Sequence, residues 1–258
     1  MKLFMKKTGG FQQKEVIATI THELKNTITN IKEAISLLSD LNYHKLDSNS
    51  QKIILIAKEE TDRLIRMVNN LLKNTALEAK KLQLHKEPTQ IEQIIQQVLE
   101  NQSITIQKKE IEIETLYIPN SPLLDIDRDQ LYDAIANLID NAVKYTPQKG
   151  KITIQTTIIN PPTPEYRKYQ LNSKVSYLKV SITDTGPGIP QKAIKRIFDS
   201  YVRLDSTTSV KGIGLGLTIA KNIIKLHQGK IWAISKLNQG ATFCFVLPII
   251  QSKKPITK

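Results

Sequence analysis

The chain has 258 residues, 40% of them hydrophobic, and this length suits two domains of ordinary size. Its 37 lysines and arginines against 24 acidic residues give a formal net charge of +13 at pH 7. Nucleic acids, anionic membranes and anionic small ligands are therefore candidate partners. Most of the cations are lysines in a chain rich in Ile, Asn and Gln, so a compositional bias explains the charge equally well.

The lone cysteine, Cys244, excludes an internal disulfide and a cysteine-based zinc site and suits a reducing compartment. It lies in an alternating run, so we expect it packed in a sheet or at a sheet edge. No apolar run approaches the ~20 residues that a membrane span requires. The charged start, 1–7, is too short for a signal peptide. We therefore expect a cytoplasmic segment without membrane contact, and any membrane anchor would lie outside it.

Two long amphipathic helices are predicted at the start of the chain. Over residues 11–41, apolar residues recur every seven positions, at Ile17, Leu24, Ile31 and Leu38. A polar turn over 42–50 precedes a second helix over about 51–79. Because one helical hairpin has too little core to be stable, we expect a dimeric four-helix bundle.

Beyond residue 81, short strands and helices alternate. Strands are predicted over 111–116, 151–158, 177–183, 230–235 and 241–247, with an extended piece near 82–88. Helices are predicted over 89–101, 129–145, 191–198 and 215–227. This mixed order predicts an α/β or α+β sandwich. The proline-rich segment 159–176 is expected to be a solvated hairpin tip.

One histidine on the first helix is a candidate nucleophile. With Ile17 and Leu24 facing the core, His22 lies on the outer face, flanked by Glu23, and Asn26 follows one turn later. A neighbouring carboxylate can hold the imidazole in one tautomer and leave the other nitrogen free to attack. Taken alone, a histidine on a solvated helix face usually has no function.

Two groups of glycines follow the strand at 177–183. The first runs from Asp184 through Gly186 and Gly188, and the second comprises Gly212, Gly214 and Gly216. Glycines let the backbone approach a ligand closely, and a helix N-terminus offers unpaired N–H groups to phosphate. The spacing fits neither a P-loop nor a dinucleotide fingerprint. A glycine pair is often only a turn, but three glycines at alternate positions before a helix favour a phosphate site.

The helix at 129–145 carries two amides on one face. Asn137 and Asn141 are four residues apart, and Lys144 follows Asn141 by nearly one turn. Amide oxygens are suitable ligands for Mg²⁺, which binds nucleotides through few protein groups. Since Asn is common in this chain, the pair by itself could be purely structural.

Together these elements resemble the sensor histidine kinases of two-component signalling. The resemblance covers about residues 11–248 and consists of motifs in the family's order. These are a phosphoacceptor box at 22–26, an Asn box at 137–145, glycine boxes at 184–188 and 212–217, a Phe box at 197–203 and a closing glycine turn at 240–243.

The resemblance implies a dimerisation and phosphotransfer domain over 11–80 and an ATP-binding domain of the Bergerat (HATPase) fold over 81–250. It implies that Asp184 accepts the adenine amino group while Gly186 and Gly188 let the backbone close over the base. Asn141 is then the expected Mg²⁺ ligand. The other nucleotide-binding residues implied are Asn137, Lys144, Tyr145, Gly212, Gly214 and Gly216.

The implied activity is autophosphorylation of His22 by ATP, with transfer to an Asp of a response regulator. Glu23 orients the ring and accepts its proton, and Arg203 reaches the γ-phosphate. Relatives that hydrolyse ATP with the same fold carry Glu at the position of Asn137, and an amide cannot take a proton from water. The implied partners are a second copy of the chain and a receiver domain. Nucleic acid is not expected, because the chain has no recognisable groove-reading helix or RNA-binding signature and arginine is scarce.

Two positions refine these expectations. Kinases with Asn at the position of Asn26 often dephosphorylate their partner as well, which predicts a second activity. Family members usually carry Pro where this chain has Thr27, so we expect a straighter first helix. The alternative to an active kinase is a catalytically degenerate nucleotide-binding scaffold, which would not need all of these motifs.

Overall fold

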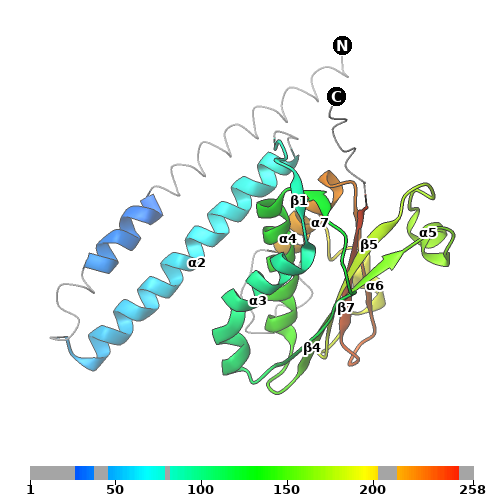
Figure 1. Cartoon of the computed structure of the whole chain (residues 1–258). Helices are drawn as coiled ribbons and strands as arrows, with labels where there is room; N and C mark the ends of the chain where they lie inside the picture. The colour runs from blue at the N-terminus through cyan, green and yellow to red at the C-terminus, as the bar shows by residue number, and fades with distance from the viewer. Residues whose placement is uncertain (1–26, 38–45, 79–81, 203–213, 250–258) are drawn as a thin grey trace, which may run out of the picture. The chain divides into compact units, whose positions relative to one another are not determined.

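The computed structural model describes residues 27–37, 46–78, 82–202 and 214–249 (Figure 1). The chain divides into two compact units, residues 1–82 and 83–258. Within the described residues, no helix is both long and apolar enough to cross a bilayer.

The first unit is helical. Residues 27–37 form part of one helix, and α2 spans Ser48–Glu78. Ile28 and Val68 are buried, and Lys32 Nζ lies 2.7 Å from Asp62 Oδ1. The second helix starts earlier than predicted because Asp47 caps it, with its Oδ1 accepting a 2.6 Å bond from the backbone N–H of Ser50.

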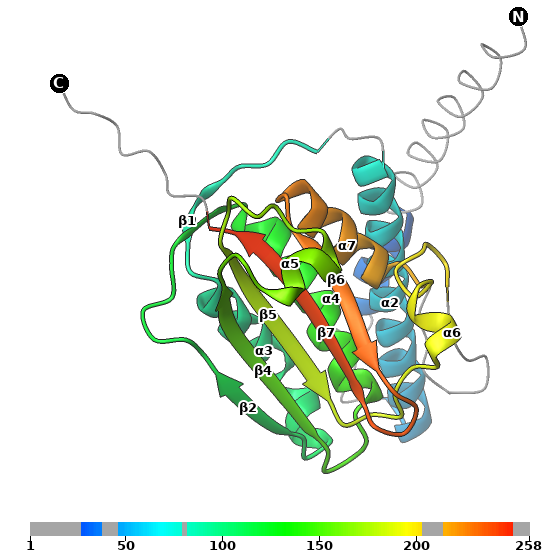
Figure 2. The same cartoon turned by 90° about the vertical axis from the view of Figure 1, so that its right-hand side faces the viewer.

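The second unit is built on a five-stranded mixed sheet (Figure 2). Its order is β2-β4-β5-β7-β6, with β2 parallel to β4 and the other neighbours antiparallel. The bounds are β2 Glu112–Leu116, β4 Lys151–Ile159, β5 Tyr177–Asp184, β6 Lys230–Ser235 and β7 Ala241–Pro248. All five strands were predicted to within a residue at either end. A separate antiparallel pair joins β1 (Glu87–Thr89) to β3 (Leu124–Ile126).

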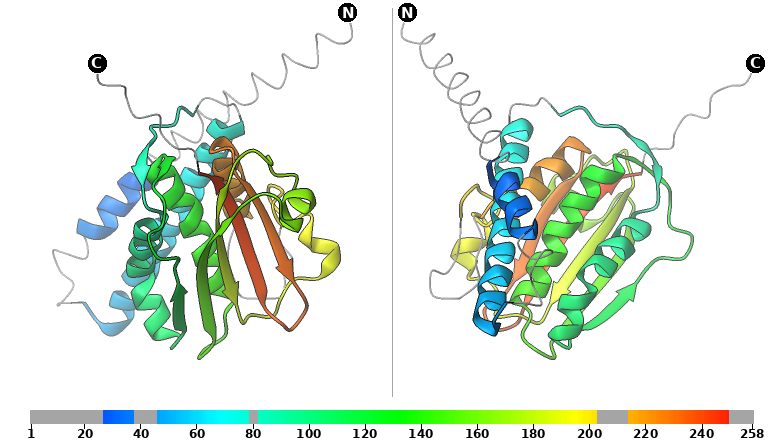
Figure 3. Two further views of the ribbon diagram at one scale, coloured as in Figure 1. Left: turned by 45° about the vertical axis from the view of Figure 1, so that its right-hand side comes forward. Right: turned by 90° about the vertical axis from the view of Figure 1, so that its left-hand side faces the viewer.

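Three helices cover one face of this sheet, the inner face: α3 (Ile91–Lys108), α4 (Arg128–Tyr145) and α7 (Gly216–Leu226) (Figure 3). α4 packs against both α3 and α7. Side chains such as Ile95, Leu138 and Ile219 are completely buried in this layer. Removing so much apolar surface from water, at roughly 25 cal/mol per Å², stabilises the two-layer sandwich.

The segment predicted to be a solvated hairpin tip folds against the opposite, outer face of the sheet (Figure 2). It forms α5, Pro164–Tyr169, which begins with a proline, as short helices commonly do. The Tyr166 hydroxyl lies 3.0 Å from the Ile159 carbonyl and 2.6 Å from the Val175 carbonyl. A small core results, comprising Ile159, Tyr166, Leu171, Tyr177 and Val246. The prediction was wrong because the segment also packs on partners far along the chain, Val246 of β7 and Trp232 of β6, which no local pattern indicates.

Other boundaries also differ from the predictions. Residue 89 belongs to β1, so α3 begins at Ile91, and it continues seven residues past the predicted end at Asn101. α6 is short, Gln191–Ile194, and is followed by turns. β3 was not predicted because three residues carry no periodic signal. Cys244 is buried in β7, which is an interior strand and not an edge.

Candidate active site

α4 presents the predicted amides and lysine along one side. Its buried residues, which include Leu131, Leu138 and Ala142, face the sheet and the neighbouring helices. Asn137, Asn141 and Lys144 are partly buried. The helix is capped at its start by Asp127, whose Oδ1 accepts a 3.0 Å bond from the Gln130 N–H.

The C-terminal end of α4 is held by a lysine from outside the helix. Lys109 Nζ donates to the carbonyls of Val143 at 2.7 Å, Lys144 at 3.1 Å and Thr146 at 2.7 Å. An ammonium group suits this end because the last carbonyls have no intrahelical partner and carry partial negative charge. Burial lowers the pKa of Lys109. The cap fixes the turn that carries Lys144 and Tyr145.

Asn137 meets the start of α7. Its Nδ2 donates a 2.8 Å bond to the Asp133 carbonyl, which turns its Oδ1 toward α7. A Cβ placed on Gly216 would lie 2.7 Å from that oxygen. The amide oxygen therefore lies beside the first residue of a helix, where backbone N–H groups can bind phosphate.

Asp184 ends β5 and is 5% exposed. Its Oδ1 accepts bonds from the N–H groups of Gly186 at 2.8 Å and Ala241 at 3.3 Å. Burial raises the pKa of this carboxyl, and the two backbone bonds oppose the rise. A Cβ on Gly186 would lie 2.8 Å from the Tyr145 carbonyl, so this turn touches the end of α4.

Ser235 joins the first glycine box to the closing glycine turn. Its hydroxyl accepts a 2.8 Å bond from Ile189 N–H and donates a 2.6 Å bond to the Gly240 carbonyl. Gly240 has φ +73°, and a Cβ there would collide with the Asp184 carbonyl. Only glycine therefore lets the β6–β7 turn close over the end of β5.

The Phe box is anchored to the sheet and to α7. Phe198 packs edge-on against Phe243 at 6.4 Å between ring centroids, and its carbonyl accepts a 3.2 Å bond from the Thr218 hydroxyl. Tyr201 N–H donates a 3.0 Å bond to the Gly214 carbonyl. Gly214 has φ +78°, and a Cβ there would lie 2.7 Å from the Val202 carbonyl, so the box and the second glycine cluster meet closely.

A buried histidine connects the N-terminus of α4 to the C-terminus of α7. His227 Nε2 accepts a 3.0 Å bond from Asp127 N–H, so Nδ1 carries the proton and donates to the Ile223 carbonyl at 2.9 Å. Burial lowers the pKa of His227. Asp127 Oδ2 also accepts a 2.9 Å bond from His85 N–H. These bonds keep α4 and α7 in a fixed relation.

The structure thus gathers part of the predicted site around α4. Asn137 lies beside Gly216, Tyr145 beside Gly186, and Gly214 beside the Phe box. Lys144 Nζ lies 5.8 Å from the centroid of the Tyr145 ring. Predicted site residues outside the described residues are His22, Glu23, Asn26, Arg203 and Gly212.

Three supporting residues were missed by the sequence analysis. Lys109 and Ser235 had no local signal, because their partners lie 34 and 46 residues away, at Val143 and Ile189. Asp127 did have one, because an Asp just before a helical pattern is a typical N-cap.

Two family profiles match the chain. Residues 12–79 match the His Kinase A (phospho-acceptor) domain, and residues 126–251 match the histidine kinase-, DNA gyrase B- and HSP90-like ATPase domain. Between them they contain every predicted site residue.

Similar proteins carry the same pair of domains. The sensor histidine kinase WalK of Bacillus subtilis is 30% identical over 92% of this chain and 37% of its own length. The adaptive-response sensory kinase SasA of Synechocystis is 30% identical over 91% and 59%. The crystal structure of full-length ShkA in complex with AMPPNP is 28% identical, covers 94% of this chain and 47% of that one, and superposes with a TM-score of 0.76.

This chain therefore spans between about a third and three fifths of these relatives' lengths. Together, the two profiles and the relatives establish that the chain belongs to the sensor histidine kinases of two-component systems.

Proposed function

We propose that this chain is an ATP-dependent protein histidine autokinase that phosphorylates His22 and passes the phosphoryl group to an Asp of a response regulator. Residues 11–80 would form the dimerisation and phosphotransfer domain, and residues 81–250 the ATP-binding domain. The observation that carries this proposal is the meeting of Asn137 with the start of α7 while Asp184 and Gly186 meet the end of α4.

ATP is the proposed phosphoryl donor. Asp184 Oδ1 is occupied by two backbone bonds, which leaves Oδ2 as the acceptor for an adenine amino group. Gly186, without a side chain, permits close approach beside the Tyr145 carbonyl. ShkA was crystallised with AMPPNP, an ATP analogue, and its likeness to this chain supports the same ligand class here.

The amides of α4 fit a magnesium-nucleotide. A Cβ on Gly216 would fill the space next to Asn137 Oδ1. Only glycine therefore keeps a space open between this amide and the first residue of α7. Asn141 would hold Mg²⁺, which neutralises phosphate charge during transfer. Gly212, Gly214 and Gly216 would cover the phosphates, with Lys144 and Tyr145 at the other end of the site.

The reaction proposed is in-line transfer to an imidazole. One ring nitrogen of His22 forms a bond to the γ-phosphorus as the bond to the ADP oxygen breaks, and the proton on the other nitrogen passes to Glu23. Arg203 would stabilise charge on the γ-phosphate. A chain that hydrolyses ATP would need a carboxylate at the position of Asn137 to take a proton from water. Because Asn137 is an amide, it supports transfer to a side chain instead of hydrolysis.

Asn26 supports a second activity of the same site. Its amide, one turn after His22, would position a water for dephosphorylation of the response regulator. If Asn26→Ala keeps autophosphorylation but loses this phosphatase, the assignment stands. An unchanged phosphatase rate in that variant would refute it.

The active form is proposed to be a homodimer. Ile53, Ile56 and Leu64 of α2 are exposed by 66%, 59% and 46% and lie along one side of the helix. Apolar residues at such spacing are typical of helices that pair with a partner. A four-helix bundle formed with a second copy would bury them.

Incubation with Mg²⁺ and γ-labelled ATP tests the kinase proposal. We expect acid-labile, base-stable label on the wild-type chain and none on His22→Gln, while both bind an ATP analogue equally. Binding without labelling of the wild type would indicate a nucleotide-binding scaffold. Label that persists in His22→Gln would assign the phosphate to another residue.

A further inference from the structure

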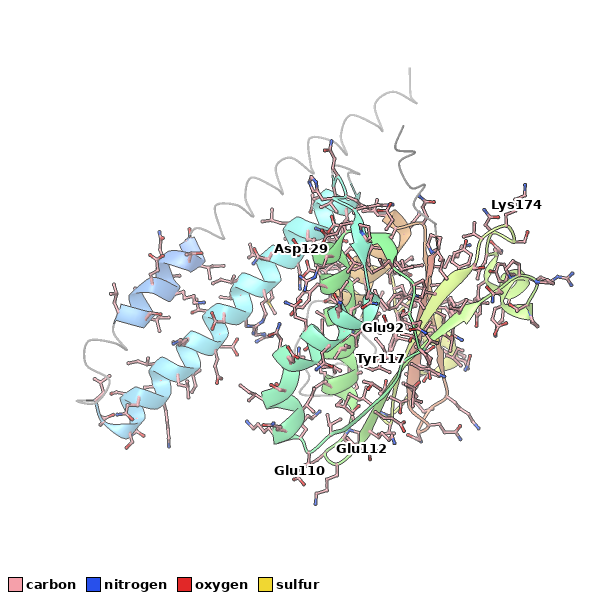
Figure 4. The ribbon with its side chains drawn as sticks, viewed as in Figure 1. Glu92, Glu110, Glu112, Tyr117, Asp129 and Lys174 are labelled. Atoms are coloured by element: carbon pink, nitrogen blue, oxygen red, sulfur yellow. The ribbon has the colours of Figure 1, made fainter. Side chains whose placement is uncertain are left out.

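The outer face of the sheet carries a surface that the kinase reaction does not use. We call it the α5 surface. It consists of the aromatic pair Tyr169 and Trp232 and five surrounding cations, Arg167, Lys168, Lys174, Lys179 and Lys230. Figure 4 shows Lys174 extending outward from the loop beside α5.

The register of the strands brings together the two lysines of the α5 surface that lie on strands, Lys179 and Lys230. On β7, Val246 pairs with Lys179 of β5 on one side and with Lys230 of β6 on the other. All three side chains point to the outer face, because directly paired residues share a face of a sheet. Val246 belongs to the small core under α5, so the two lysines flank that core.

The α5 surface has a large charge imbalance. No ion pair involves any of its five cations within the described part of the chain, and Glu165 is the single acid of α5. The other side of the same face differs, because Lys151 Nζ is paired there with Glu112 at 2.9 Å and Glu114 at 3.3 Å. The positive charge is therefore concentrated around α5.

An aromatic stack lies among these cations. The Tyr169 and Trp232 rings are 3.7 Å apart between centroids and 17° from parallel. Lys168 Nζ lies 5.2 Å from the centroid of the Tyr169 ring. Trp232 Nε1 is buried and has no hydrogen-bond partner among the described residues. Aromatic residues with a polar rim around them are common in protein interfaces.

We propose that the α5 surface binds an acidic face of a partner protein. The five unpaired cations supply the charge complementarity, and the small core under α5 holds the aromatic pair in place before binding. Asp184 and Lys179 are five residues apart on β5 and so point to opposite faces of the sheet. A partner on this surface would therefore leave the nucleotide site accessible.

A protein fits this surface better than the two other anionic partners. Four of the five cations are lysines, whereas phosphate contacts in nucleic-acid binding favour the bidentate guanidinium of arginine. None of the large exposed hydrophobic residues lies on α5 or on the loop that follows it, so this described segment offers a bilayer little exposed apolar surface.

Trp232 is the only tryptophan in the chain, so its fluorescence reports directly on this surface. The experiment titrates the full chain with poly-L-glutamate as the stand-in for an acidic protein face. We expect a change in Trp232 emission, with binding about tenfold weaker when salt rises from about 50 to 300 mM, because screening shortens the range of charge attraction.

Two charge-reversal variants test whether the site is local. Lys168→Glu/Lys174→Glu/Lys230→Glu should weaken poly-L-glutamate binding by at least about tenfold, since each reversal replaces attraction with repulsion. The control variant is Lys108→Glu/Lys192→Glu/Lys195→Glu, which changes the net charge by the same amount at exposed positions on α3 and near α6. It should change poly-L-glutamate binding by less than about threefold, because distant charges are screened. Both variants should bind an ATP analogue like the wild type.

The outcomes separate the alternatives. Equal weakening by the two variants would overturn the proposal, because the binding would then follow net charge alone. An unchanged Trp232 emission at saturating poly-L-glutamate would also overturn it. A short DNA duplex or phosphatidylserine vesicles could also bind more tightly than poly-L-glutamate and lose more affinity in the α5 variant. That result would identify the partner as a nucleic acid or a membrane instead of a protein.

Discussion

At the scale of single residues, Asp184 shows what it costs to bury a carboxyl group. Its carboxyl is buried at the end of β5, and burial raises its pKa even though two backbone N–H groups bind Oδ1. A carboxylate ionised there at neutral pH costs folding free energy. The adenine contact proposed for Asp184 would explain why such a costly group is kept.

We predict that Asp184→Asn weakens nucleotide binding without destabilising the fold. The amide oxygen can still accept the bonds from Gly186 and Ala241, but the amide NH₂ then faces the position proposed for the adenine donor. ATP-analogue binding should weaken by more than about tenfold, since hydrogen bonds to charged groups contribute about 1.5–3 kcal/mol. Calorimetric titration measures this effect.

The same variant should unfold at an equal or higher temperature than the wild type at pH 7. The raised pKa of Asp184 means that its protonated form stabilises the folded state, and this contribution is lost as pH rises through that pKa. The difference in Tm between variant and wild type should therefore shrink in acid. A variant that lost both binding and Tm would argue for a structural role of Asp184.

At the scale of elements, α4 depends on a cap that lies outside its own sequence. Lys109 follows α3 and donates to three carbonyls at the end of α4. The helix start is tied to His227 by Asp127. Both ends are thus held by residues distant in sequence, and Asn137 between them keeps its place beside Gly216 at the start of α7.

We predict that Lys109→Met lowers the free energy of unfolding of the second unit by about 1–3 kcal/mol, because carbonyls at the end of α4 lose their donor. ATP-analogue affinity should fall as well, since the cap fixes the turn that carries Lys144 and Tyr145. Urea denaturation and calorimetric titration measure the two effects. Lys108→Met, at the exposed neighbouring position, is the matched control and should change neither.

Lys109→Arg should restore part of the stability, because a guanidinium also donates to carbonyls. Full stability in Lys109→Met would show that water replaces the ammonium at this end. If Lys109→Met lost stability but kept its nucleotide affinity, Lys109 would contribute to folding and not to nucleotide binding.

At the scale of the whole molecule, the predicted dimer depends on the exposed apolar side of α2. We predict that Leu64→Glu raises the dissociation constant of the dimer by at least about tenfold, because a charge would have to be buried in the bundle. Asn69→Glu lies on the opposite side of the helix and serves as the control. Analytical ultracentrifugation over a dilution series measures both. If the two variants had the same dissociation constant, the dimer interface would not lie on the Leu64 side of α2.

Much of the architecture could be predicted from local patterns. Alternating residues located all five strands of the main sheet, and the order of motifs identified the family. Helix ends were less accurate because capping depends on single residues such as Asp47 and on pairing such as that of β1 with β3. The bounds of the two domains and the roles of the site residues remain predictions.

The sequence by itself determined the fold class and the candidate residues of the site, because periodicity and motif spacing are local properties of the chain. The tertiary structure alone decided that Lys109 caps α4, that Gly216 abuts Asn137 and that the segment 159–176 forms α5 on the outer face. Each of these depends on contacts between residues far apart in sequence. Their partners are chosen by strand register and packing, which no local pattern encodes.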